Sequence, residues 1–160
     1  MPQITIEYMI MIPLLIMQIF LFPLTVGWIM TMWTESRQTL ALREVAGHIG
    51  SSVHQLYSAL SHKSISEGNV TNELAIPTFV EGYVYTANAT LRSASGSSAE
   101  SSKILDISVR FVDSGIEAAA SVTLGSDVEW APSTFVSNSP NAKLVATKFS
   151  NNTILMRFEG

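Results

Sequence analysis

Cysteine is absent from the 160 residues of this chain. Its absence excludes disulfides, thiolate metal sites and cysteine nucleophiles, and it leaves the redox compartment open. Any folded domain must therefore be held together by burial of apolar side chains. Basic residues are also few, with nine Lys and Arg against 13 Asp and Glu, for a net charge of −4. This composition does not indicate a basic surface, so we expect that the protein does not bind nucleic acid.

Catalytic motifs are missing as well. The chain has no HExxH, no P-loop, no dinucleotide fingerprint and no G-x-S-x-G elbow. No two of its histidines have the i,i+4 spacing of a helical metal site, so we expect solvated helix surface at His48, His54 and His62. The acidic residues of the second half lack an EF-hand pattern. Asp127 and Glu129, near Trp130, could contact a cation or a sugar, although a polar loop explains them better. We therefore expect that the protein is not an enzyme and that it binds no cofactor and no metal ion.

Charged side chains are absent from one long stretch, Tyr8 to Thr34. Its apolar length exceeds the roughly 20 residues that a helix needs to cross a bilayer. The stretch is too long for a secretory signal peptide and lacks its basic region and cleavage site. Trp28 and Trp33 suit a membrane interface at its far end. A buried helix of a soluble domain is the alternative, but the rest of the chain is too small to surround it.

Three residues should weaken this helix. Pro13 and Pro23 cannot donate to the carbonyl groups of Met9 and Ile19, so each should kink or locally open it, and Gly27 adds a weak point. Membrane helices tolerate such residues because neighbouring groups satisfy the backbone. The second interpretation is a helix that bends in order to pack among copies of itself.

The helix should continue beyond the apolar stretch to about His62, for a length of roughly 80 Å. Its second part carries an amphipathic stripe at spacings of three and four residues: Leu42, Val45, Ile49, Val53, Leu56 and Leu60. This stripe should pack on the chain's own β domain, and it could also contact neighbouring subunits. We therefore predict a helix over residues 1–62, apolar over about 7–34 and amphipathic over about 35–62.

The remaining residues change to the alternating pattern of strands. We predict a linker over 63–75 and a β-rich head over 76–160. The expected strands are Phe79–Thr86, Ile104–Val112, Ala118–Leu124, Lys143–Phe149 and Thr153–Phe158. Ser150-Asn151-Asn152 suits a hairpin turn. The whole pattern predicts an α+β fold, with a long N-terminal hydrophobic helix followed by a small antiparallel, sandwich-like head.

The residues that precede the apolar stretch carry a resemblance. The segment from Gln3 to Tyr8 (QITIEY) resembles the Gln-x-Ser/Thr-x-Glu-Tyr motif of archaeal type IV pilin-like proteins, the class III signal peptide family. The layout of helix and β head is similar too. In the head, Ile76-Pro77 followed by the run from Glu81 to Tyr85 resembles a strand opening frequent in that family. The resemblance makes the expected fold type IV pilin-like.

That resemblance implies a function. The chain would be a structural subunit, major or minor, of an archaeal type IV pilus-like filament at the cell surface. Its implied partners are the membrane before assembly, a prepilin peptidase, an assembly ATPase with its membrane platform, and copies of itself or related pilins. The implied assembly residues are Gln3, Thr5, Glu7 and Tyr8. Cleavage before Gln3 would make Glu7 the fifth residue of the mature chain; in this sequence, Met1 and Pro2 precede Gln3.

Glu7 also has an interpretation independent of the family. It is the only charged side chain before Glu35. A buried, unpaired carboxylate would cost several kcal/mol or take up a proton. The α-amino group of a neighbouring subunit would offset that cost and fix the stagger between subunits. Alternatively, Glu7 lies among lipid headgroups, stabilised by the positive end of the helix dipole.

Three N-x-S/T sequons lie beyond the apolar stretch, and they make Asn69, Asn88 and Asn151 candidates for N-glycosylation. They and the pilin-like layout predict that the residues after Thr34 are extracytoplasmic. The second functional hypothesis is a membrane-anchored extracytoplasmic binding protein that does not polymerise.

Overall fold

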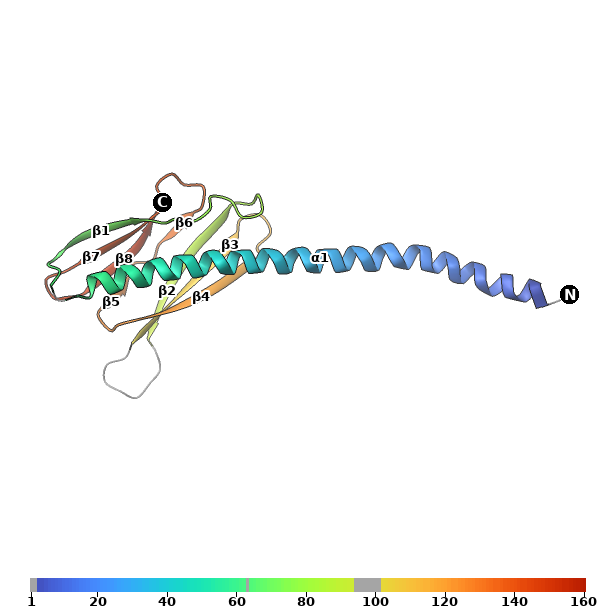
Figure 1. Ribbon diagram of the computed structural model, residues 1–160, viewed down its shortest axis with the longest axis horizontal. Coiled ribbons are helices and arrows are strands. Elements are labelled where there is room, and N and C mark those ends of the chain that lie inside the picture. The colour runs from blue at the N-terminus through green and yellow to red at the C-terminus, as the bar shows by residue number, and fades with distance from the viewer. Residues whose placement is uncertain (1–2, 63, 94–101) are drawn as a thin grey trace. The chain divides into compact units, whose positions relative to one another are not determined.

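The structure is a computed structural model that describes residues 3–62, 64–93 and 102–160, with side chains from Tyr8 onward. It contains one helix, α1 (Gln3–Leu60), followed by eight strands (Figure 1). The chain divides into two compact units, Met1–Arg37 and Gln38–Gly160. We describe each unit by itself and call the second one the head.

The first unit is the N-terminal part of α1. The helix runs through Pro13 and Pro23 without interruption. Proline costs a helix one hydrogen bond and crowds the preceding turn, and the neighbouring straight-chain residues Leu, Met and Gln are good helix formers. The bends expected at the two prolines and at Gly27 stay a prediction.

The head is built from two four-stranded sheets. The first has the order β1-β7-β8-β5, formed by Gly68–Glu73, Lys143–Lys148, Ile154–Glu159 and Val128–Trp130. The second has the order β4-β3-β2-β6, formed by Glu117–Leu124, Lys103–Phe111, Tyr85–Ser93 and Thr134–Val136. All neighbours pair antiparallel except β5 and β8. The predicted α+β fold, a long N-terminal helix followed by an antiparallel-rich β head, is confirmed.

The core of the head includes the amphipathic part of α1. The predicted stripe is buried throughout, from Leu42 at 0% exposed to Leu56 at 7%. It belongs to one cluster with the inward residues of both sheets, such as Ile107 of β3 and Ile154 of β8. Close packing is visible at Gly50, where a Cβ atom would lie 2.8 Å from the side chain of Val122 in β4. This half of the helix is thus part of the head.

The strands differ from the expected ones in three places. β1 occupies Gly68–Glu73, which the sequence predicted as linker, and its residues are almost all exposed. An edge strand of this kind shows no apolar alternation, so its sequence looks like a loop. The strand expected to begin at Phe79 begins at Tyr85, after a tight turn. The short strands β5 and β6 were not predicted, because three residues carry too little periodicity.

Candidate assembly surface

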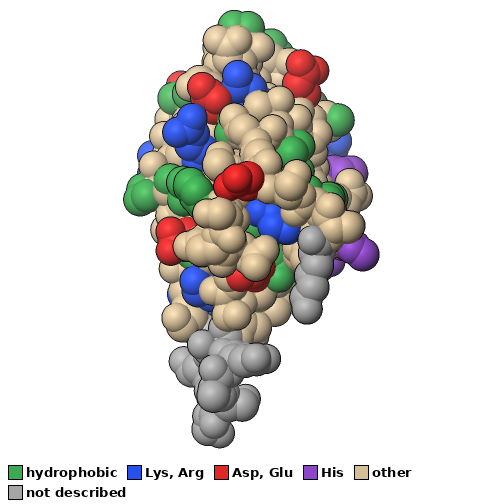
Figure 2. All heavy atoms as spheres, turned by 90° about the vertical axis from the view of Figure 1, so that its left-hand side faces the viewer, with side chains coloured by type: hydrophobic (Ala, Val, Ile, Leu, Met, Phe, Trp, Pro, Cys, Tyr) green, Lys and Arg blue, Asp and Glu red, His purple; other side chains and the backbone are tan. Residues whose placement is uncertain are grey.

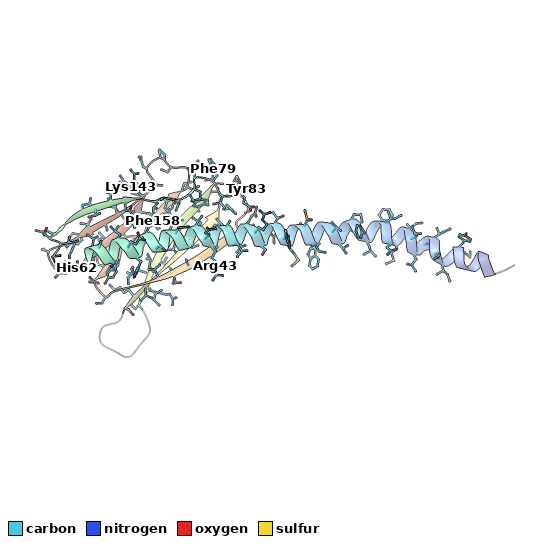
Figure 3. The ribbon with its side chains drawn as sticks, in the orientation of Figure 1. Arg43, His62, Phe79, Tyr83, Lys143 and Phe158 are labelled. Carbon is cyan, nitrogen blue, oxygen red and sulfur yellow. The ribbon has the colours of Figure 1, made fainter. Side chains whose placement is uncertain are left out.

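The apolar part of α1 presents its side chains on all sides. None of the large apolar residues from Tyr8 to Trp33 is buried, and Phe20, Trp28 and Trp33 are each 68% exposed. Figure 3 shows side chains projecting from both sides of this part of the helix. By length and composition α1 could cross a membrane. Soluble monomers rarely expose so large an apolar surface, which marks a region that meets lipid or protein.

The threonine side chains in this segment form hydrogen bonds to the backbone of the helix itself. The hydroxyl of Thr25 donates to the carbonyl oxygens of Leu21 (3.1 Å) and Phe22 (2.9 Å). The hydroxyls of Thr31 and Thr34 donate to carbonyls four residues earlier, at 3.0 and 2.9 Å. Each hydroxyl is thereby satisfied without water. The segment therefore presents an apolar surface even where its sequence contains threonine.

Pro23 borders a shallow groove of about 460 Å³, lined by Leu15, Gln18, Ile19, Phe22 and Pro23 itself. Proline has no N–H, so the carbonyl of Ile19 lacks its usual helical donor. Gln18, whose side chain ends in an amide, lines the same groove. Away from water, both groups need partners. The groove is thus a place where a second chain could contribute hydrogen bonds to an apolar bundle.

The predicted assembly residues lie at the beginning of this helix. Gln3, Thr5 and Glu7 are in helical backbone, but their side chains lie outside the described part of the chain. Tyr8 is 62% exposed. The assembly roles of these four residues stay predictions.

A buried lysine fixes the other end of α1 in the head. Lys148 of β7 is 4% exposed, and its ammonium group donates to the carbonyl oxygens of Leu60 (2.7 Å) and His62 (3.0 Å). The last carbonyls of a helix lack donors within the helix and carry partial negative charge. Lys148 therefore caps the helix from a strand more than 80 residues later. Nothing in the sequence separates this lysine from a surface one.

A tight turn leads into β2. Val80 and Tyr83 exchange two backbone hydrogen bonds of 3.1 and 2.9 Å around Glu81 and Gly82, whose φ angles are 50° and 85°. This geometry is that of a two-residue turn with both central residues left-handed. Nearby, the hydroxyl of Tyr85 donates to the carbonyl of Pro77 at 2.6 Å. Figure 3 shows Phe79 and Tyr83 at this turn, where they are 54% and 41% exposed.

One member of the acidic pair near Trp130 is held by a contact with α1. Asp127 accepts a hydrogen bond of 3.1 Å from the hydroxyl of Tyr57. The rings of Trp130 and Phe158 pack in a T-shaped arrangement, with 4.9 Å between their centroids. Within residues 3–62, 64–93 and 102–160 no group of three or more His, Asp or Glu residues could hold a metal ion. Figure 2 shows acidic and basic side chains interspersed on the face it views, without a patch of one sign.

All three sequon asparagines are exposed on the head. Asn69 lies on the edge strand β1, and its side-chain oxygen is 3.4 Å from the hydroxyl of Thr147. Asn151 lies in the turn before β8, where its side-chain oxygen accepts from the backbone N–H of Thr153 at 3.0 Å. Asn88 lies on β2, between two other strands of its sheet. Exposure leaves all three open to modification.

Comparison of the chain with models of protein families, with curated proteins and with solved structures gave no match. Functional inference therefore rests on the geometry just described and on the residues themselves.

Proposed function

We propose that this protein is a structural subunit of a surface filament, similar to an archaeal type IV pilin, and that it assembles through the apolar part of α1. The observation that carries the proposal is the exposure of every large apolar residue from Tyr8 to Trp33, from 42% at Val26 to 78% at Met9. A helix that is apolar on all faces needs an apolar environment around its whole circumference. A bundle of copies of the same helix supplies one, as the membrane does before assembly.

Two further features support a bundle. The groove at Pro23 is lined by Gln18 and by Ile19, whose carbonyl the proline leaves without its usual helical donor. Lipid tails offer no hydrogen bonds to these groups, whereas a neighbouring helix can. The motif from Gln3 to Tyr8 places Glu7 where the resemblance implies an assembly glutamate.

The head is well suited to this role. It has its own core, which includes the second half of α1, so it does not require the apolar segment for its internal packing. In the proposed filament, the heads face solvent and the apolar helices form the centre. The membrane-anchored ectodomain remains the competing function, since a bilayer alone would also cover the apolar segment.

Substitution of Glu7 separates the two functions. We expect Glu7→Gln to leave membrane insertion unchanged, since insertion depends on the apolar residues that follow. Filament assembly should be strongly impaired, because the neutral amide cannot pair ionically with the amino terminus of an incoming subunit. Loss of one partner from a desolvated charge pair typically costs about 3–5 kcal/mol, and every subunit interface in the filament would lose it.

The matched control is Glu67→Gln, the same chemical change at an exposed residue of the head. Surface filaments are counted by electron microscopy, and membrane-bound protein is measured by immunoblot. Filaments should persist in the Glu67→Gln strain and be lost in the Glu7→Gln strain at equal membrane levels. Normal filament numbers with Glu7→Gln would refute the assembly role, and absence of filaments in the unmodified strain would favour the anchored ectodomain.

A further inference from the structure

We propose that Asn88 carries an N-linked glycan whose first sugars lie in a polar trough on the outer face of the β4-β3-β2-β6 sheet. The inference rests on the proposed function in one respect, because modification requires the head to be outside the cytoplasm. It is carried by the register of four strands and by the side chains that this register brings together.

The floor of the trough is a row of short side chains. Asn88 of β2 pairs in register with Thr134 of β6 on one side and with Ser108 of β3 on the other, and Ser108 pairs with Ala119 of β4. Side chains opposite one another on adjacent strands have Cβ atoms about 5 Å apart and share one face of the sheet. All four point away from the core, since their sequence neighbours Ala87, Phe135, Val109 and Ala118 are buried. The row is thus a continuous low strip across the sheet.

The wall on one side of the floor is formed by a row that contains two long side chains, Arg110 and Glu117. Arg110 of β3 and Glu117 of β4 are paired in register, and Thr86 of β2 continues the same row. The carboxylate of Glu117 accepts a hydrogen bond from the hydroxyl of Ser108, which ties this wall to the floor. Thr86, Arg110 and Glu117 line a hollow of about 310 Å³ together with three floor residues, Asn88, Ser108 and Thr134.

The row on the opposite side is held by an ion pair. Asp106 of β3 accepts hydrogen bonds from Arg92 of β2, whose Nη2 lies 3.3 Å from Oδ1, and from the hydroxyl of Ser121 at 2.6 Å. These contacts also lower the pKa of Asp106, chiefly through the bond from Arg92. The ion pair is partly exposed, so it contributes little to stability. Its contacts nevertheless connect side chains of β2, β3 and β4 along this side of the floor. The trough therefore has a defined border on each side.

The sequon is placed for modification within this trough. A strand alternates its side chains between faces with a period of two, so Asn88 and Thr90 are exposed on the same outer face. In the transfer, the amide nitrogen of Asn88 forms a bond to the anomeric carbon of a lipid-linked sugar phosphate or diphosphate. The bond from that carbon to the phosphate oxygen breaks, the lipid phosphate leaves, and the amide nitrogen loses one proton.

The lining of the hollow suits a tethered sugar better than a free one. Hydroxyl, amide, guanidinium and carboxylate groups line it, and all of them can hydrogen-bond to sugar hydroxyls. None of the residues lining the hollow is aromatic, so a free sugar would lack a stacking surface. A covalent link removes the entropic cost of association, so hydrogen bonds to Arg110 and Glu117 suffice to position the glycan over the sheet.

The test uses the full chain purified from its native host and peptide mass spectrometry of all three sequons. We expect sugar on the peptide that contains Asn88, loss of that sugar in Thr90→Val, and its retention in Thr90→Ser, which keeps the sequon hydroxyl. The position of the glycan is tested by modification of arginines with phenylglyoxal. Arg110 should react severalfold faster in Thr90→Val than in the unmodified protein or in Thr90→Ser. Arg157, exposed on β8 of the other sheet, should react at the same rate in all three.

Each result that differs from these expectations refutes a particular part of the proposal. An unmodified Asn88 refutes the inference, and filaments counted in the same preparation show whether the proposed function survives it. A modified Asn88 with unchanged Arg110 reactivity shows a glycan that projects into solvent and refutes the trough. Sugar confined to Asn69 or Asn151 refutes the choice of Asn88 while keeping the head outside the cytoplasm.

Discussion

At the scale of single residues, Lys148 connects a strand of the head to the end of α1. Replacing Lys148 by Met keeps the length and apolar stem of the side chain but removes the donors to the carbonyl oxygens of Leu60 and His62. Hydrogen bonds that involve a charged group contribute about 1.5–3 kcal/mol. We expect Lys148→Met to lower the free energy of unfolding by about 2–3 kcal/mol in a denaturant titration.

The same strand supplies the control for this measurement. Lys143 lies at the other end of β7, where its ammonium group is 3.6 Å from Glu159 and both side chains are partly exposed. Exposed pairs of this kind contribute at most about 1 kcal/mol, so Lys143→Met should have a much smaller effect. Equal effects of the two substitutions would contradict a capping role for Lys148.

A second buried polar residue predicts a dependence on alkaline pH. Burial raises the pKa of Tyr85 from 10.0 to about 12, and its hydroxyl donates to Pro77. The raised pKa means that the folded state favours the protonated hydroxyl. The resulting stabilisation is complete below pH 10 and is lost as the pH rises through about 12. Two pKa units correspond to roughly 2.7 kcal/mol.

We expect Tyr85→Phe to be less stable at neutral pH, because it lacks the bond to Pro77. Between pH 10 and 12 it should lose less stability than the unmodified protein, since it has no hydroxyl to ionise at this position. Denaturant titrations at several pH values in that range provide the measurement. Parallel pH profiles for the two proteins would show that Tyr85 does not control alkaline unfolding.

At the scale of elements, the periodicity of apolar residues was sufficient to predict the helix or strand wherever that element buries one regular face. The stripe from Leu42 to Leu60 predicted the buried face of α1. Alternation predicted both ends of β3, β4, β7 and β8 to within one residue. Periodicity did not predict β1, because this strand is exposed on both faces. It also misplaced the start of β2, because the residues from Phe79 to Val84 alternate like a strand but contain the tight turn at Glu81-Gly82.

Contacts between elements that lie far apart in the chain could not be predicted from the sequence. The parallel pairing of β5 with β8 depends on a register that three residues cannot specify alone. The cap by Lys148 depends on where β7 lies relative to the end of α1. The sequon at Asn88 was visible in the sequence, but the trough around it needs the pairing of four strands. The exposure of the apolar segment, in contrast, followed from its length and from the small size of the remaining chain.

At the scale of the whole molecule, the two units obey different physical rules. The first unit exposes apolar side chains over its whole surface, whereas the head buries them in one cluster. The boundary at Gln38 lies within a continuous helix and falls just before the first core residue, Leu42. The helix therefore joins a segment that needs an apolar environment to one that folds around its own core.

This division predicts how truncated chains behave. A chain that begins at Thr34 retains Leu42 and Val45 and the rest of the core, and it loses nearly all of the apolar segment. We expect it to be a soluble monomer or weak oligomer with a single cooperative thermal transition, while the full chain requires detergent or assembly.

A chain that begins at Gly47 also lacks Leu42, Val45 and Ala46, all at most 4% exposed. Removal of each large buried aliphatic side chain costs about 2–5 kcal/mol, so the shorter chain should unfold or aggregate. Size-exclusion chromatography and calorimetry distinguish these outcomes. If the chain that begins at Thr34 is insoluble as well, the apolar segment is required for the fold of the head, and the division at Gln38 does not describe independent units.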